Sequence, residues 1–79
     1  MNNLIHYDWP GYRLLVSFNV YGNSTNYGVL LEHATFENFY EWVKGCFDGR
    51  VPVGISVVML SDELFDQYAD DGLQIVEGG

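Results

Sequence analysis

The chain has 79 residues, enough for one hydrophobic core, and we expect residues 1–79 to form a single domain. Its hydrophobic fraction of 48% and aromatic fraction of 16% exclude intrinsic disorder. Eleven acidic residues stand against 3 basic ones, which gives a net charge of -8 at pH 7. Because such a charge repels nucleic acid and anionic membranes and attracts basic surfaces, we expect no direct binding to nucleic acid or membrane.

The N-terminal part of the sequence has neither a basic start nor a long apolar segment, and no stretch approaches the roughly 20 apolar residues of a membrane span. Residues 4–7 favour an extended start and residues 9–11, Trp-Pro-Gly, favour a turn. The single cysteine, Cys46, cannot form an internal disulfide, and its apolar surroundings predict a buried thiol. These features predict a soluble, cytoplasmic protein.

The first clear strand pattern covers residues 12–21, YRLLVSFNVY, in which apolar side chains alternate with polar ones. We expect Arg13, on the polar side of this strand, to face water. Residues 22–26, GNSTN, predict a hairpin loop, and residues 27–33, YGVLLEH, predict the returning strand.

A helix is predicted next, over FENFYEWVKGCFDG. Thr35 is suited to its N-cap, and Gly49, just past its end, is a C-cap signal. Apolar side chains repeat at helical spacing and predict the stripe that faces the core, formed by Phe36, Phe39, Tyr40, Val43 and Phe47.

Residues 50–60, RVPVGISVVML, are apolar and rich in β-branched side chains, which predicts a strand in the middle of the sheet. Pro52 must lie at the start of this strand because proline cannot donate a ladder hydrogen bond. Gly54 predicts a β-bulge.

Ser61 predicts the N-cap of a second helix, over SDELFDQYADDG, which Gly72 ends. Residues 73–76, LQIV, predict a last short strand. The whole pattern predicts an α+β fold in which a small antiparallel sheet of about four strands carries two helices, in the order β-β-α-β-α-β. The residues expected to hold the second helix to the core are Leu64, Phe65 and Tyr68.

The second helix aligns carboxylates along one side, because Asp62, Asp66 and Asp70 follow one another at i, i+4 and i+8 with Glu63 beside them. Each pair of like charges at this spacing destabilises a helix by about 0.2 to 0.5 kcal/mol. The helix dipole favours acids in the first turn but disfavours Asp70 and Asp71 at the end. We expect this row of acids to face outward, with no Lys or Arg close enough to form an ion pair with it. We interpret it as a binding surface; the alternative is an ordinary solvated helix face.

Patterns for catalysis and metal binding are absent from the sequence. The histidines, His6 and His33, and Cys46 do not have the spacing of a zinc set or of a Cys-His nucleophile pair. The run DQYADDG lacks the alternating ligands of a calcium loop, and so short a chain can hardly provide the cleft that a glycosidase needs. No phosphate-binding loop or nucleophile elbow occurs. We expect no enzyme, no metal and no cofactor.

The carboxylate row has a spacing on the scale of DNA phosphates. Residues four apart on a helix are separated by about 6 Å along its axis, and phosphates on one DNA strand by about 3.4 Å per nucleotide. In size, charge sign and α+β layout the chain resembles the small acidic proteins, many from bacteriophages, that block nucleic-acid-binding enzymes by mimicking DNA. Anti-CRISPR proteins, anti-restriction proteins and the uracil-DNA glycosylase inhibitor belong to this class. The segment TFENFYEWVKGCFDG is similar to the aromatic-rich helix that several of them pack on a small sheet.

This resemblance implies an inhibitor of the anti-CRISPR type. Its partner would be a basic nucleic-acid-binding protein or complex of a bacterial host, met in the host cytoplasm if a phage encodes the chain. The resemblance gives the candidate phosphate substitutes as Glu37, Glu41, Asp48, Asp62, Glu63, Asp66, Asp70 and Asp71.

Two alternatives remain open on the sequence. An antitoxin or immunity protein would use the same acids to plug the active site of a nuclease. A structural module would instead assemble as a homo-oligomer through its aromatic side chains, although we favour a monomer. The aromatic residues that could anchor an interface are Tyr12, Tyr21, Tyr27, Trp42 and Tyr68.

Overall fold

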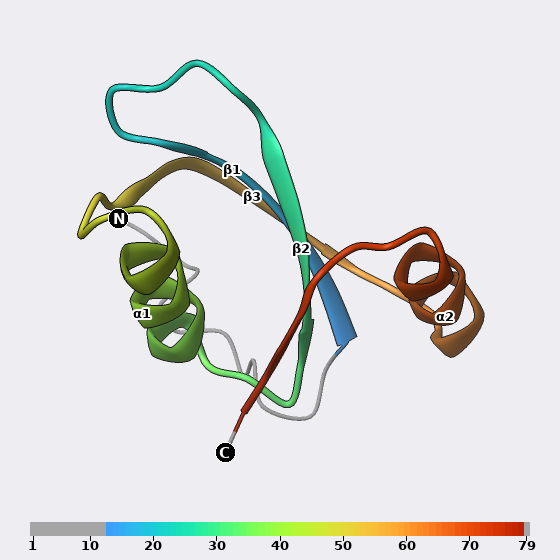
Figure 1. Cartoon of the computed structure of the whole chain (residues 1–79). Coiled ribbons are helices and arrows are strands. Elements are labelled where there is room, and N and C mark those ends of the chain that lie inside the picture. Colours follow the sequence, from blue (N-terminus) through green and yellow to red (C-terminus); the bar gives the residue numbers. More distant parts are fainter. Residues whose placement is uncertain (1–12, 79) are drawn as a thin grey trace.

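The computed structural model describes residues 13–78, which form a four-stranded sheet with a helix on either side (Figure 1). The α+β class and the element order β-β-α-β-α-β predicted from the sequence are confirmed. The predicted extended start at residues 4–7 and the turn at 9–11 lie outside the described residues. In chain order the elements are β1 (Arg13–Val20), β2 (Tyr27–Glu32), α1 (Phe36–Cys46), β3 (Pro52–Met59), α2 (Asp62–Asp70) and β4 (Ile75–Glu77).

The strands lie in the order β3-β1-β2-β4, and the sheet is mixed. β1 pairs antiparallel with β2, through the predicted hairpin, and also with β3. β4 pairs parallel with β2, so the prediction of an antiparallel sheet is wrong for this one pair. The cause is the crossover through α2: the chain leaves β3 at one edge, passes over the sheet as a helix and returns in the same direction at the other edge.

β3 is an edge strand, and its predicted place in the middle of the sheet is wrong. The expected details of its first half are confirmed: Pro52 starts it, and the register with β1 shifts beside Gly54, whose φ is 61°. An apolar sequence predicted burial on both sides, but β3 has only β1 as a neighbour among the described residues. Val58 and Met59 are 50% and 64% exposed.

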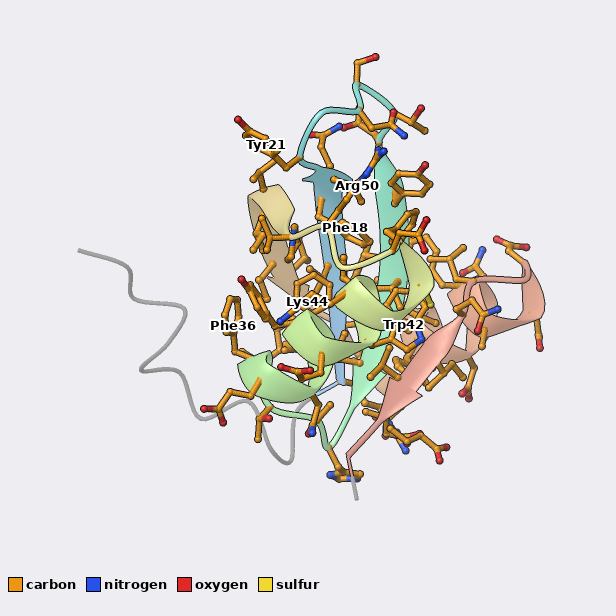
Figure 2. The ribbon with its side chains drawn as sticks, turned by 60° about the vertical axis from the view of Figure 1, so that its left-hand side comes forward. Phe18, Tyr21, Phe36, Trp42, Lys44 and Arg50 are labelled. Carbon is orange, nitrogen blue, oxygen red and sulfur yellow. The ribbon has the colours of Figure 1, made fainter. Side chains whose placement is uncertain are left out.

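The main core lies between α1 and one face of the sheet. β1 contributes every second side chain to it, and α1 contributes Phe39 and Val43, which are fully buried. The rings of Phe18 and Phe39 meet edge to face at 5.2 Å between centroids. Figure 2 shows Phe18 under α1, with Phe36 and Trp42 on opposite sides of the helix. The predicted core-facing stripe of α1 is confirmed for Phe36, Phe39, Val43 and Phe47. It is wrong for Tyr40, which is not among the side chains packed against the core; Trp42 packs there instead.

The two ends of α1 are closed by local hydrogen bonds. Thr35 and Asn38 form a capping box, in which the Asn38 N–H donates to Thr35 Oγ1 at 3.0 Å and the Thr35 N–H donates to Asn38 Oδ1 at 2.9 Å. The helix ends at Cys46, earlier than predicted, because Asp48 and Gly49 both take positive φ, 59° and 80°. The Cys46 side chain is exposed, so the prediction of a buried thiol is wrong.

Among the described residues, α2 covers the second face of the sheet, and only in part. β2 is buried on both faces, since Val29, Leu30 and Leu31 are all fully buried. Leu30 lies on the same face as Arg13 and Glu32, where α2 places Phe65, which is 4% exposed. Leu64, predicted to help hold α2 to the core, is 44% exposed, so that part of the prediction is wrong.

Candidate acidic interface

α2 displays five of the eight predicted partner-binding residues on an exposed surface. The helix begins at Ser61, whose Oγ accepts a hydrogen bond from the Leu64 N–H at 3.2 Å. It ends at Asp70, and the chain turns away at Gly72, which has a φ of 101°, with a hydrogen bond from the Leu73 N–H to the Tyr68 carbonyl. Because both ends are capped within the chain, the helix needs no partner to hold its shape. The five exposed acids are Asp62, Glu63, Asp66, Asp70 and the C-cap residue Asp71.

These five acids do not all point the same way. Phe65 marks the side of α2 that docks on the sheet. At about 100° per residue, Asp62 lies about 60° from Phe65, on the docking flank, whereas Asp66 and Asp70 turn progressively outward and Glu63 lies almost opposite. We call the four acids that point away from the sheet the α2 acidic face: Glu63, Asp66, Asp70 and Asp71.

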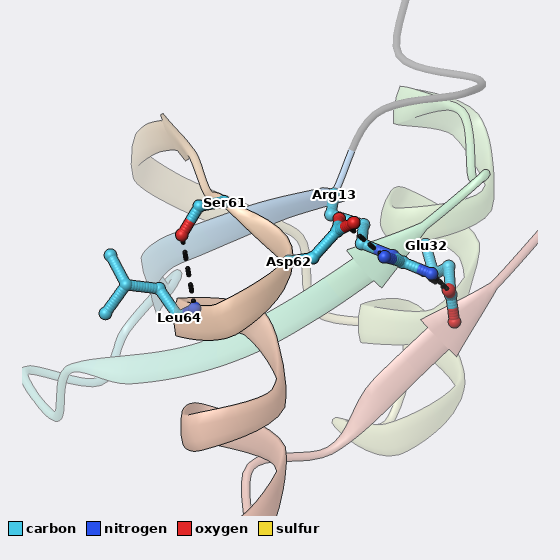
Figure 3. A network of polar contacts seen from close by, with 5 residues as sticks. All are labelled: Arg13, Glu32, Ser61, Asp62 and Leu64. Carbon is cyan, nitrogen blue, oxygen red and sulfur yellow. Dashed lines mark hydrogen bonds and ion pairs between the residues drawn. The ribbon is translucent and has the colours of Figure 1, made fainter.

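Asp62 is held by Arg13, in a network that joins three elements (Figure 3). Arg13 Nη1 donates to Asp62 Oδ1 at 2.6 Å, and Arg13 Nε and Nη2 donate to Glu32 Oε2 at 3.0 and 2.8 Å. The guanidinium also lies over the Phe65 ring, 5.4 Å from its centroid. The hydrogen bonds with Glu32, and after them the one with Asp62, raise the pKa of Arg13 above its usual value.

The network corrects two expectations from the sequence. Arg13 was expected to face water, but its side chain is only 33% exposed and ties the first turn of α2 to β1 and β2. The acid row was expected to have no base to answer it, yet Asp62 has one. Sequence reasoning missed Arg13 because it lies 49 positions from Asp62, which no local spacing can reveal. The available signal was its isolation as a base at the start of an apolar strand.

The rest of the row has no counter-charge. Residues 51–79 contain six acids and no Lys, Arg or His. Within the part of the chain that the structure describes, the α2 acidic face takes part in no ion pair. Asp66 and Asp70 are about 6 Å apart along the helix and both are exposed. The structure therefore concentrates uncompensated negative charge on the outer side of α2.

The other three predicted residues lie on the opposite side of the molecule. Glu37, Glu41 and Asp48 are exposed on α1 and the turn after it, and the sheet separates α1 from α2 (Figure 1). This side also carries the other two bases of the described residues, Lys44, whose Nζ lies 5.5 Å from the centroid of the Tyr40 ring, and Arg50. The structure thus divides the eight predicted residues into two surfaces. Among residues 13–78, Lys44 and Arg50 lie on the α1 side, and the one base on the α2 side, Arg13, pairs with Asp62 and leaves the α2 acidic face without a base.

The turn after α1 borders an open depression of about 270 Å³ lined by Cys46, Phe47, Asp48 and Arg50. It is a shallow surface feature in which no set of groups converges. Among residues 13–78, no three His, Cys, Asp or Glu side chains gather closely enough to hold a metal ion.

None of the helices formed by residues 13–78 combines the length and the apolar character that crossing a membrane requires. Comparison of the chain with protein-family models, with curated proteins and with solved structures found no match.

Proposed function

We propose that this chain is a binding protein, not an enzyme, and that it inhibits a bacterial defence complex of the type that anti-CRISPR proteins block. Its α2 acidic face occupies the basic surface on which that complex holds nucleic acid, and the carboxylates take the place of phosphates. The partner is a basic nucleic-acid-binding protein, and the encounter takes place in the cytoplasm of the bacterial host.

The observation that carries this proposal is the difference between Asp62 and the residues that follow it. The chain uses one of its three bases to pair with Asp62, and this links the first turn of α2 to β1 and β2. Among the described residues, Asp66 and Asp70 have no counter-charge, although an i, i+4 acid pair and an acid at a helix C-terminus both cost stability. The repulsion between these carboxylates on the outer side of the helix supports a role in binding a basic surface, because a partner's Lys and Arg would neutralise the carboxylates.

The structure also changes which residues we propose. The α2 acidic face is the primary contact, with Asp62 as the residue that positions it. Glu37, Glu41 and Asp48 belong to α1 and the turn after it, and the sheet separates α1 from α2 (Figure 1), so they can contact only a partner that wraps around the molecule or a second subunit of the complex. Among the aromatic candidates, Tyr12 lies outside the described residues, and Tyr27 and Trp42 pack against the core, so we no longer propose these two as anchors. Tyr21 is 71% exposed, but it follows β1 at the end away from Arg13.

The test is capture of the target from lysates of bacteria that carry a defence system, with three versions of the tagged chain. These are the natural chain, Asp66→Asn/Asp70→Asn, and Glu37→Gln/Glu41→Gln, which removes the same charge from the other side. The captured protein should be a nucleic-acid-binding component, and short duplex DNA should displace it. The α2 variant should bind more weakly by about 1 to 3 kcal/mol, or roughly 5- to 150-fold in Kd.

Salt provides a second criterion. The association rate should fall steeply between about 50 and 500 mM salt, because the Debye length shrinks well below the dimensions of the interface. A partner that DNA does not displace, and whose on-rate does not change with salt, would argue against mimicry. If the captured protein is a nuclease toxin and this chain binds at its active site, the result would instead support the antitoxin alternative.

A further inference from the structure

The two edges of the sheet differ in how well they are protected against pairing with another strand. The β4 edge is only three residues long and carries Glu77. The β3 edge is eight residues long, and residues 51–60 contain no charged side chain. Natural edge strands are usually blunted by shortness, by lysines or by covering elements, because their free backbone groups can pair with another chain. Proline and β-bulges protect an edge as well, and the first half of β3 has both, at Pro52 and Gly54. Among the described residues, the second half of β3 has none of these protections.

The backbone groups that β3 presents outward follow from the register with β1. The Leu60 N–H donates to the Arg13 carbonyl at 2.9 Å, and Val58 lies opposite Leu15. Since the direction of backbone groups alternates along a strand, Leu60 and Val58 point toward β1, and Val57 and Met59 point away from it. No strand formed by residues 13–78 pairs with their N–H and C=O groups, which form the outer edge of the sheet. α2 leaves this edge open, because it packs over β1 and β2.

We propose that β3 is a dimerisation edge, which a second copy of this chain joins in antiparallel orientation. The two-fold axis passes beside Val58, so that Val57 of one copy pairs with Met59 of the other and the two Val58 side chains lie directly opposite each other. This register uses the outward backbone groups of both copies. It also covers two apolar side chains that are now half or more exposed, Val58 and Met59.

Charge favours a second copy at this edge over any other surface. In a two-fold pair each charged residue near the axis meets its own equivalent, and like charges directly opposite are destabilising. Residues 51–60 avoid this, whereas both helices of this strongly acidic chain carry exposed carboxylates. A single pair of short strands buries less than the roughly 1,200 Å² of a stable interface, and the net charge of -8 on each copy opposes association. The dimer is therefore weak, and salt strengthens it.

The experiment is sedimentation equilibrium of the full chain at several concentrations, in about 50 and 500 mM salt. The natural chain should shift from monomer to dimer as its concentration rises, with a lower dissociation constant at the higher salt concentration. Val58→Lys and Val58→Glu should each raise the dissociation constant about tenfold or more, because each places like charges face to face. An equimolar mixture of the two variants should form a heterodimer. Val58→Thr, which keeps the β-branched shape without a charge, is the control and should still dimerise.

The heterodimer distinguishes the proposed register from simple misfolding, because unfolded variants would not restore each other. A natural chain that stays monomeric at every concentration overturns the proposal, whatever else then covers the edge, residues 1–12 included. A Val58→Lys variant that dimerises like the natural chain overturns it as well. The proposal does not rest on the inhibitory function, since the variants keep every acid of α2 and the expected salt dependence has the opposite sign.

Discussion

The double substitution Asp66→Asn/Asp70→Asn should make the isolated chain more stable. Arg13 already offsets the charge of Asp62, so its repulsion of Asp66 counts for little. What remains is the Asp66–Asp70 pair, which costs about 0.2 to 0.5 kcal/mol, and the unfavourable dipole at Asp70, about 0.3 to 1 kcal/mol. Both side chains are exposed, which favours the lower part of these ranges. We expect a gain of about 0.5 to 1 kcal/mol, or roughly 2 to 8 °C in Tm for a domain of this size.

Thermal unfolding followed by circular dichroism would measure this gain, first at low salt and then at about 1 M. The gain should nearly vanish at high salt, because a Debye length of about 3 Å is shorter than the spacing between the two carboxylates. Glu37→Gln/Glu41→Gln is the matched control: it changes the net charge equally, but Glu37 lies in the first turn of α1, where the dipole favours an acid, and Lys44 lies in its last turn. This control should bring no gain. An equal rise in both variants would show that overall charge is responsible, and a fall in the α2 variant would show that its carboxylates have partners within the chain.

Two further predictions concern how α2 is attached to the sheet. Phe65→Ala should lower the free energy of unfolding, measured in urea, by about 3 kcal/mol, because it removes the buried side chain between α2 and the sheet. Leu64→Ala, which changes an exposed side chain, should lower it by less than about 0.5 kcal/mol. Equal effects would contradict the docking of α2 through Phe65. Arg13→Gln should lower Tm by an amount that stays constant from about pH 7 to 10. Because the pKa of Arg13 is raised in the folded chain, its contribution to stability is complete below the ordinary guanidinium pKa and is lost only as pH rises through the higher folded pKa. A loss that fades within this pH range would show that the guanidinium is not the group responsible.

Much of the fold could be predicted because its signals are local. The alternation in β1, the Gly-Asn-Ser-Thr-Asn loop and the caps at Thr35 and Ser61 each depend on residues a few positions apart, and all appear where expected. The exposure of the acids on α2 also followed from helical spacing alone. These are the features for which a short window of sequence contains the whole physical cause.

The remaining features depend on contacts between distant parts of the chain. The position of β3 at an edge follows from the order in which strands pair, and an apolar strand such as ISVVM has the same composition in the middle of a sheet or at its border. The parallel direction of β4 follows from where α2 crosses. The bridge from Arg13 to Asp62 likewise exists only once α2 lies on the sheet. Sequence reasoning therefore found the acids but not the base that orients them.

The placement of β3 and β4 at opposite sides of the β1–β2 hairpin affects how the chain is made. Leu14 pairs with Met59 and Leu30 with Ile75, so both outer strands meet partners about 45 positions earlier in the chain. At a synthesis rate of about 5 to 20 residues per second, the hairpin waits roughly 2 to 9 s on the ribosome before either flank is covered. During this time the Leu30 side of β2 faces water without α2, and the hairpin has two free edges. We expect the yield of folded protein to rise on cooling, if cooling slows aggregation more than it slows translation. The yield should also rise when a chaperone that binds extended apolar segments is present during synthesis.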